Sequence, residues 1–478
     1  MTYTRKLATL AVLGTMLGSV GCHGDYLTGG ELSTSPNRPT EASNRNLFIP
    51  IQAEIFNLLS GDPARVTGIY AQEFSGISRQ YYALDATYSQ DPNTTNGQHQ
   101  GVYSSGGLVD IVNLEKQAKT QGDTLFLGIA QISEGMLMGS AADLFGDLVY
   151  SQALQNKPNP TPDTQLAVYD SVQKVLSAGI ANLQAYHTGG TNAGPGPADL
   201  NYGGSAKKWI ALAHTLKARF YMHTAKVDAT AYAKALAEAQ LGITDPTGAG
   251  DYKAAVTGSQ IGESNLYYQF NDYYRGDMFP GGPTIDSLLV SHNDPRRDLY
   301  VTPCTAANVK SSFTGCTPGD PAPSGLYDFG DFVNDPSFQV PLVTYNENTL
   351  IWAEAAYRTG DQATALTKLN EERANVGADL APSSLSGQAL LNEILNEEYV
   401  NDFGLGFEAF ILYNRTCTPN LVPHSSTKKI PGRLFYDASE QQTNTNLPPA
   451  GQGINGYRNK ATPASTTSDG TGAACLGQ

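Results

Sequence analysis

Two helices joined by a very short turn, at residues 344–377, are the strongest constraint on how this chain can fold. Leu350, Ala353 and Tyr357 recur at the spacing of one face of an α-helix. The glycine that follows can end this helix, and Asp361 can accept a hydrogen bond from the free N–H groups of the next one. Two helices connected so closely must run antiparallel. One such hairpin cannot bury its apolar face alone, so we expect further pairs to stack on it.

The motif AEAAYRTGD, at 353–361, is typical of a tetratricopeptide hairpin. A second hairpin of this kind is predicted from the helical patterns at 205–224 and 232–241, and two more helices are predicted within 108–154. We therefore predict a mostly α-helical protein, in which a tetratricopeptide-like scaffold of about four helix pairs carries long irregular loops that form a ligand face. The loops are predicted as insertions near 75–105, 188–204 and 245–343.

The N-terminus has the features of an export signal. Arg5 and Lys6 precede an apolar run at 7–17, which is too short to span a membrane as a mature helix. Small residues then lead to Cys22, an order that resembles a bacterial lipoprotein signal. The pattern departs from that signal at Ser19, where leucine is usual.

From this pattern we predict a lipoprotein signal peptide at 1–21 and a lipid on Cys22. A polar tether is predicted at 22–45, followed by a single domain at 46–478. The alternative is an ordinary secretory signal that is cut near Gly21 and leaves Cys22 as a free thiol.

Four cysteines remain once Cys22 is assigned to the lipid. An even number of cysteines in an exported chain suggests disulfides. Four cysteines can form disulfides in three ways, and proximity in the sequence favours the pairs 304–316 and 417–475. A zinc site is disfavoured, because no C-x-x-C spacing occurs and no histidines cluster near these positions. The predicted disulfide cysteines are Cys304, Cys316, Cys417 and Cys475.

Charge and motif content argue against nucleic-acid binding and against catalysis. The chain has 30 Lys and Arg against 45 Asp and Glu, a formal net charge of −15, and we predict no nucleic-acid partner. The sequence has no H-E-x-x-H, no G-x-S-x-G and no phosphate-binding glycine loop. His214 and His223 fall on opposite faces of one predicted helix and cannot share a metal. We predict no enzyme activity, no metal and no cofactor.

Eight segments follow one another in an informative order. They are LTGGELSTSPNRPTEAS, ADLFGDLVY, DLNYGGSAKKWIALAHTLKARFYM, the E-x-N segment at 263–270, DPRRDLY, IWAEAAYRTGD, YNRTCTP and PGRLFYDASEQQTN. Behind the lipoprotein-like start, this set resembles the SusD/RagB family of outer-membrane nutrient-binding lipoproteins over most of the mature chain.

The resemblance implies a location and a partner. Members of that family are lipid-anchored in the outer membrane and lie as a hinged lid over a SusC-like, TonB-dependent barrel. They help to deliver oligosaccharides, or in some cases peptides, into it. We therefore expect this chain to bind a nutrient without catalysis and to hand it to such a transporter. The alternatives are a surface glycan-degrading enzyme and a helical adaptor that binds protein and has no small-molecule site.

Tyrosines in the predicted loops are the best candidates for binding a ligand. A tyrosine can cover the apolar face of a sugar ring and hydrogen-bond through its hydroxyl. Arginine and aspartate nearby can add charge-assisted hydrogen bonds. The alternative is that these tyrosines only pack the loops onto the scaffold; Trp209 and Trp352 lie in helical stripes and are predicted as core. The predicted ligand-binding residues are Arg79, Tyr81, Tyr82, Asp85, Tyr88, Tyr273, Tyr274 and Arg275.

Overall fold

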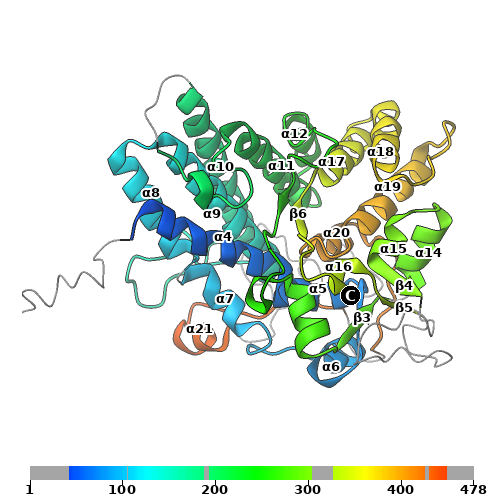
Figure 1. Cartoon of the computed structure of the whole chain (residues 1–478), viewed down its shortest axis with the longest axis horizontal. Coiled ribbons are helices and arrows are strands. Elements are labelled where there is room, and N and C mark those ends of the chain that lie inside the picture. The colour runs from blue at the N-terminus through cyan, green and yellow to red at the C-terminus, as the bar shows by residue number, and fades with distance from the viewer. Residues whose placement is uncertain are drawn as a thin grey trace, which may run out of the picture.

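We describe residues 42–104, 106–187, 193–281, 283–303, 327–425 and 430–448 of a computed structural model. This part of the chain is mostly helical, and its strands are short (Figure 1). Long helices follow one another across the upper part of the molecule, and shorter helices and strands gather below them (Figure 1). The predicted mostly α-helical class is confirmed.

Antiparallel helices joined by short turns build the scaffold. Its helices are α8 (Leu108–Gln121), α9 (Thr124–Phe145), α10 (Gln165–His187), α11 (Ala206–Thr224), α12 (Ala231–Ala239), α17 (Tyr345–Arg358), α18 (Gln362–Val376), α19 (Gly387–Asn401) and α20 (Glu408–Thr416). Helix α8 packs on α9, α11 on α12, α17 on α18, and α19 on α20. The pairs also contact one another, because α10 packs on both α9 and α11, and α12 packs on α17. The paired-helix scaffold predicted from the sequence is therefore present.

The predicted hairpin is formed by α17 and α18, and the local sequence defines both of its ends. Thr344 and Glu347 form a reciprocal capping box, in which the Thr344 hydroxyl accepts from the Glu347 N–H at 3.1 Å. Asp361 caps α18 by accepting from the Thr364 N–H at 3.0 Å. Gly377 ends α18 with a φ of 84°, which glycine adopts without steric cost.

Helix α9 is a core helix. It is long and apolar enough to cross a membrane by length and composition, but 83% of its most apolar window is buried inside the described fold. Gly128, Gly135 and Gly139 lie against α10 and α11. A Cβ added at Gly128 would come within 2.7 Å of Leu183, and one added at Gly139 would come within 2.2 Å of Phe220. These glycines therefore let the neighbouring helices approach α9 closely.

Helix α10 lies outside the helices predicted from the sequence. Its Val168, Val172, Leu176 and Leu183 are buried. They recur at helical spacing, so the signal for this helix is present in the sequence.

The predicted insertions hold short regular elements within otherwise irregular chain. Strands β1 and β3, β2 and β6, and β4 and β5 form two-stranded antiparallel sheets. These elements are β1 (Phe74–Gly76), α6 (Arg79–Thr87), α7 (Asn96–Tyr103), η1 (Gly196–Ala198), β2 (Tyr252–Lys253), η2 (Ile261–Glu263), α13 (Leu266–Tyr268), η3 (Gln269–Tyr274), β3 (Met278–Pro280), α14 (Pro283–Ser291), α15 (Arg296–Tyr300), β4 (Val301–Pro303), β5 (Tyr327–Phe329), α16 (Asp331–Asn334) and β6 (Pro341–Val343).

The ends of the described chain bear on the predicted tether and disulfides. Helix α4 (Asn44–Ser60) begins inside the segment predicted as tether and is followed by α5 (Asp62–Tyr70), and α21 (Ala438–Thr443) lies near the other end. The predicted signal peptide and lipid site fall in 1–41, outside the described residues. Cys304, Cys316 and Cys475 also lie outside them. Cys417 is disulfide-bonded, and the pairing of the cysteines stays a prediction.

The two tryptophans differ in burial. Trp209 is fully buried, and its indole N–H donates to Asp199 Oδ2 at 2.8 Å. Trp352 is only partly buried, and Lys368 Nζ lies 3.9 Å from its ring centroid. The core prediction holds for Trp209 and in part for Trp352.

Candidate functional site

Two segments that are far apart in the sequence, 74–88 and 266–280, lie side by side below the helical scaffold, where Figure 1 labels α6 and β3. Strand β1 pairs antiparallel with β3. Tyr81 of α6 packs on Phe270 of the π-helical segment η3, with ring centroids 4.6 Å apart. These two contacts place the segment that carries Tyr81 and Tyr82 against the segment that carries Tyr273 and Tyr274.

Three of these tyrosines project into solvent. Tyr82 is 56% exposed, Tyr273 is 55% exposed and Tyr274 is 59% exposed. The rings of Tyr273 and Tyr274 meet edge to face, with centroids 4.9 Å apart. Large aromatic faces are usually buried, so three exposed tyrosines on adjoining segments are candidates for stacking on a ligand.

Arg79 and Arg275 stand beside these tyrosines and share the carboxylate of Asp277. Asp277 Oδ2 lies 3.6 Å from Arg79 Nη1 and 3.9 Å from Arg275 Nη1. The other carboxylate oxygen accepts a hydrogen bond from the Ser78 hydroxyl. Asp277 is fully buried, so it joins the two segments from beneath while both guanidiniums reach solvent. We name the exposed set the tyrosine–arginine patch: Arg79, Tyr82, Tyr273, Tyr274 and Arg275.

The backbone of α6 is strained at both ends. Arg79 has a φ of 50° and Tyr88 a φ of 46°, in the left-handed region that residues other than glycine seldom adopt. Such strain costs on the order of 1–3 kcal/mol per residue and persists only where the surroundings fix it. The Arg79 guanidinium lies 3.6 Å from Asp277, and Tyr88 packs edge to face on Tyr70 with ring centroids 5.8 Å apart.

Two of the predicted ligand-binding tyrosines belong to the core, which corrects the prediction for them. Tyr81 is fully buried; its hydroxyl donates to Asp62 and accepts from Arg65 Nε at 3.2 Å. Tyr88 is buried as well, and its hydroxyl accepts from the His424 backbone N–H at 2.9 Å. Both rings are used for packing and are closed to a ligand in this structure.

Asp85 is also buried and has its own partners. It accepts from the Gly76 N–H at 2.8 Å and pairs with the imidazole of His424. The hydrogen bond to Asp85 raises the pKa of His424 above its ordinary value, against the effect of burial. Asp85 therefore fixes the position of α6 beside β1 rather than presenting a carboxylate to solvent.

Sequence reasoning missed three residues that shape this site: Asp277, Phe270 and His424. Asp277 meets Ser78 across 199 positions, and His424 meets Asp85 across 339. Contacts of such separation leave no local pattern in the sequence. The dense run of aromatic and charged residues around Phe270 was the available signal.

A recess lies along α6, the helix that carries Arg79 and Tyr82. It has a volume of about 300 Å³ and is lined in part by Gln80, Ala83 and Asn93. This is the lower end of the size range of small-molecule sites. None of the five patch residues lines the recess, so it is a separate feature of α6.

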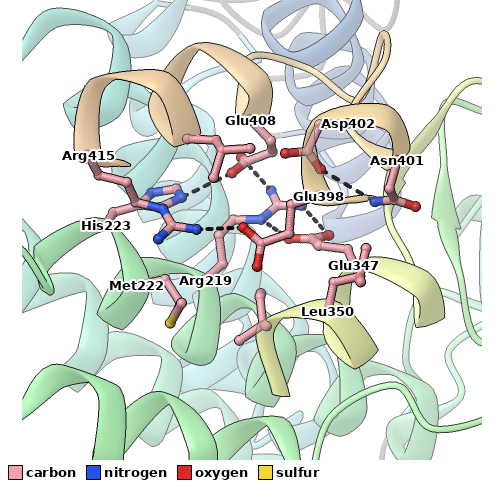
Figure 2. Close-up of a pocket in the computed structure, with 12 residues that line it drawn as sticks. Arg219, Met222, His223, Glu347, Leu350, Glu398, Asn401, Asp402, Glu408 and Arg415 are labelled. Atoms are coloured by element: carbon pink, nitrogen blue, oxygen red, sulfur yellow. Dashed lines mark hydrogen bonds and ion pairs between the residues drawn. The ribbon is translucent and has the colours of Figure 1, made fainter. Parts of the chain in front are cut away.

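A second polar cluster is buried among α11, α17, α19 and α20 (Figure 2). Arg219 lies within it, with Nη2 donating to Glu347 Oε2 at 2.6 Å and Nη1 3.3 Å from Glu408 Oε1. Arg415 donates to Glu398 at 2.8 Å. The cavity between these groups is about 30 Å³, room for a water or two and too small for a sugar.

Asp143, His223 and Glu408 in this cluster have candidate metal-ligand atoms within 4.8 Å of one another. His223 Nδ1 lies 2.7 Å from Asp143 Oδ1, and Nε2 lies 3.0 Å from Glu408 Oε2. Burial alone would lower the pKa of His223, but the two carboxylates outweigh it and raise the pKa to about 9. The two ring nitrogens of His223 thus face two different carboxylates, and in this structure the three residues form a chain of ion pairs.

Comparisons with known proteins agree on one architecture. A family model described as "Starch-binding associating with outer membrane" matches residues 36–437. None of the curated proteins compared with this chain matches it.

Several solved structures are similar over most of their length. A SusD/RagB family protein from Bacteroides thetaiotaomicron is 22% identical with a TM-score of 0.65, and the match covers 85% of this chain and 95% of that one. A chitin-binding protein is 23% identical with a TM-score of 0.64, covering 83% and 94%. A chitin-binding SusD homolog from Flavobacterium johnsoniae is 16% identical with a TM-score of 0.67, covering 87% and 99%. At these identities the likeness shows the fold alone.

Proposed function

This chain belongs to the SusD-like family of starch-binding proteins that associate with the outer membrane, and from that premise we propose that it binds an oligosaccharide through the tyrosine–arginine patch. The observation that carries the proposal is the exposure of Tyr82, Tyr273 and Tyr274 on two adjoining segments. Each ring can cover the C–H face of a sugar, and its hydroxyl can bond to the sugar's edge. Arg79 and Arg275 add hydrogen-bond donors at the same surface.

We propose that this binding is non-catalytic. Stacking and hydrogen bonding are what the residues of the patch offer, and none of the five is a carboxylate that could act as general acid or nucleophile on a glycosidic bond. A peptide is the second ligand class that we keep, because tyrosine and arginine also bind peptides well.

The ligand's onward route is also part of the proposal. We propose that a lipid on Cys22 holds the protein at the outer membrane and that it hands its ligand to a SusC-like, TonB-dependent transporter. The support is the family membership together with the lipoprotein-like start of the chain. Each buried methylene of an acyl chain contributes about 0.8 kcal/mol, so two or three chains give stable anchoring.

The experiment that tests the proposed function measures both binding and turnover. The purified protein is titrated with malto-, chito- and uronate oligosaccharides, and the mixtures are analysed for cleavage products. Saturable binding with unchanged oligosaccharides is the expected result. Cleavage would indicate a glycan-degrading enzyme instead, and the absence of any binding would favour a protein-binding adaptor.

Tyr274→Ala and Tyr82→Ala are each expected to weaken oligosaccharide binding by about 1–3 kcal/mol, as expected for the loss of an aromatic anchor. Calorimetric titration measures this as a roughly fivefold to 150-fold rise in Kd. Leu241→Ala is the control, because Leu241 is 60% exposed but follows α12, at the opposite side of the molecule from α6 (Figure 1). Unchanged binding in both tyrosine variants, with the fold intact, would remove these residues from the site.

Cys22→Ala is expected to move the protein from the membrane fraction to the soluble fraction, because the variant has no thiol to carry the lipid. Fractionation of cells and mass spectrometry of the mature N-terminus measure this. A wild-type N-terminus without acyl chains would contradict the proposed anchor.

A further inference from the structure

The two arginines of the tyrosine–arginine patch carry two positive charges, and the carboxylate that both approach supplies only one negative charge. Arg79 and Arg275 both approach the same oxygen, Asp277 Oδ2, at 3.6 and 3.9 Å. These distances are longer than hydrogen bonds. Within the described residues, neither guanidinium donates a hydrogen bond, although each has five N–H donors. Two cations of like sign thus share one buried anion, and their donors face solvent.

The other acidic groups near the patch do not supply the missing charge. Asp85 is paired with His424, and Asp62 lies 3.2 Å from Arg65. Asp272 precedes Tyr273 in η3, but within the described residues it forms an ion pair with neither Arg79 nor Arg275, which both approach Asp277 instead. A further anion placed between the two guanidiniums would therefore relieve their repulsion.

We propose that the oligosaccharide bound at this patch is acidic and carries carboxylate groups, as in a chain of uronic acids; this inference rests on the proposed function. The planar guanidinium fork matches a carboxylate with two parallel hydrogen bonds, which a hydroxyl cannot reproduce. The tyrosines stack on the sugar rings, and the arginines bind the carboxylates at their edges. The chain as a whole is acidic, with a formal net charge of −15, so the preference has to come from contacts within about a Debye length, roughly 8 Å in physiological salt.

The test uses pairs of ligands that differ only in charge. Full-length protein in detergent is titrated by calorimetry with oligogalacturonate and oligoglucuronate and with the methyl ester of each, alongside neutral malto- and chito-oligosaccharides. At least one acid is expected to bind about tenfold tighter than its own ester. In the double variant Arg79→Gln/Arg275→Gln, with its fold checked by circular dichroism, both affinities fall and the preference for the acid is lost. Tyr274→Ala is the matched control: it should weaken acid and ester by a similar factor and keep the preference.

Three outcomes would overturn the inference, and they differ in their meaning for the proposed function. If the esters and neutral oligosaccharides bound as tightly as the acidic oligosaccharides or more tightly, the acidic ligand would be refuted. The proposal of oligosaccharide binding would then remain in place. Failure of every saccharide to bind would refute both. Retention of the acid preference in the double arginine variant would also refute the inference, since other groups would then be responsible for it.

Discussion

Arg219→Met is expected to destabilise the fold by about 3–5 kcal/mol, the cost of removing one partner from a buried ion pair. Arg219 is 1% exposed, and its guanidinium bonds to Glu347 and to the backbone carbonyl of Leu342 and faces Glu408. Methionine keeps much of the volume and removes the charge. Two carboxylates would then remain in the interior with less compensation, which is the main source of the loss. Urea unfolding followed by circular dichroism measures the change.

Two further variants separate charge from packing in this experiment. Lys207→Met changes an exposed residue of the same helix and should alter stability by no more than about 0.5 kcal/mol. Adding Glu347→Gln to Arg219→Met should restore part of the lost stability, because it removes one of the stranded charges. A loss in Arg219→Met no larger than that in Lys207→Met would show that the buried network contributes little.

The predictable part of this fold is the part encoded locally. The α17–α18 hairpin follows from the Thr344 cap, the Asp361 cap and the terminal Gly377, all within one short segment. Helix α10 had an equally local signal in its buried Val168 and Val172, and reading every window for helical spacing would have found it.

The candidate site was predictable in outline and not in detail. Loops rich in tyrosine and arginine could be singled out, but the sequence does not state which side of a short helix faces the core. Tyr81 and Tyr82 are neighbours in α6, and successive residues of a helix point about 100° apart. One is therefore fully buried and the other 56% exposed, although the two residues are identical in type.

The buried ion pairs could not be predicted because their partners are distant in the sequence. Arg219 and Glu347 are 128 positions apart, and His223 and Glu408 are 185 apart. In the sequence these residues look like ordinary surface charges of amphipathic helices. Only the packing of α11 against α17 and α20 brings these residues together. Each buried charge then has an opposite charge beside it, which offsets the free-energy cost of removing it from water.

The same packing leads to a strong pH dependence at His223. Its folded-state pKa is raised to about 9, from an ordinary value of 6.5, because Asp143 and Glu408 outweigh the effect of burial. The folded state therefore binds this proton more tightly than the unfolded state does. The resulting stability is fully present below pH 6.5, falls as the pH rises towards 9, and is absent above it. The size of the effect is about 3 kcal/mol, from the value of one pKa unit.

His223→Gln is expected to remove this pH dependence. Wild type should lose about 3 kcal/mol more stability than His223→Gln between pH 6 and pH 9.5, measured by urea unfolding at each pH. Titrating groups away from His223 contribute to both proteins alike, so the difference between the two slopes reports His223 together with Asp143 and Glu408, whose pKa values it lowers. Gln388→Ala, at an exposed and non-titrating position, should keep the wild-type slope. Equal slopes in wild type and His223→Gln would mean that the imidazole is not held as a cation between Asp143 and Glu408.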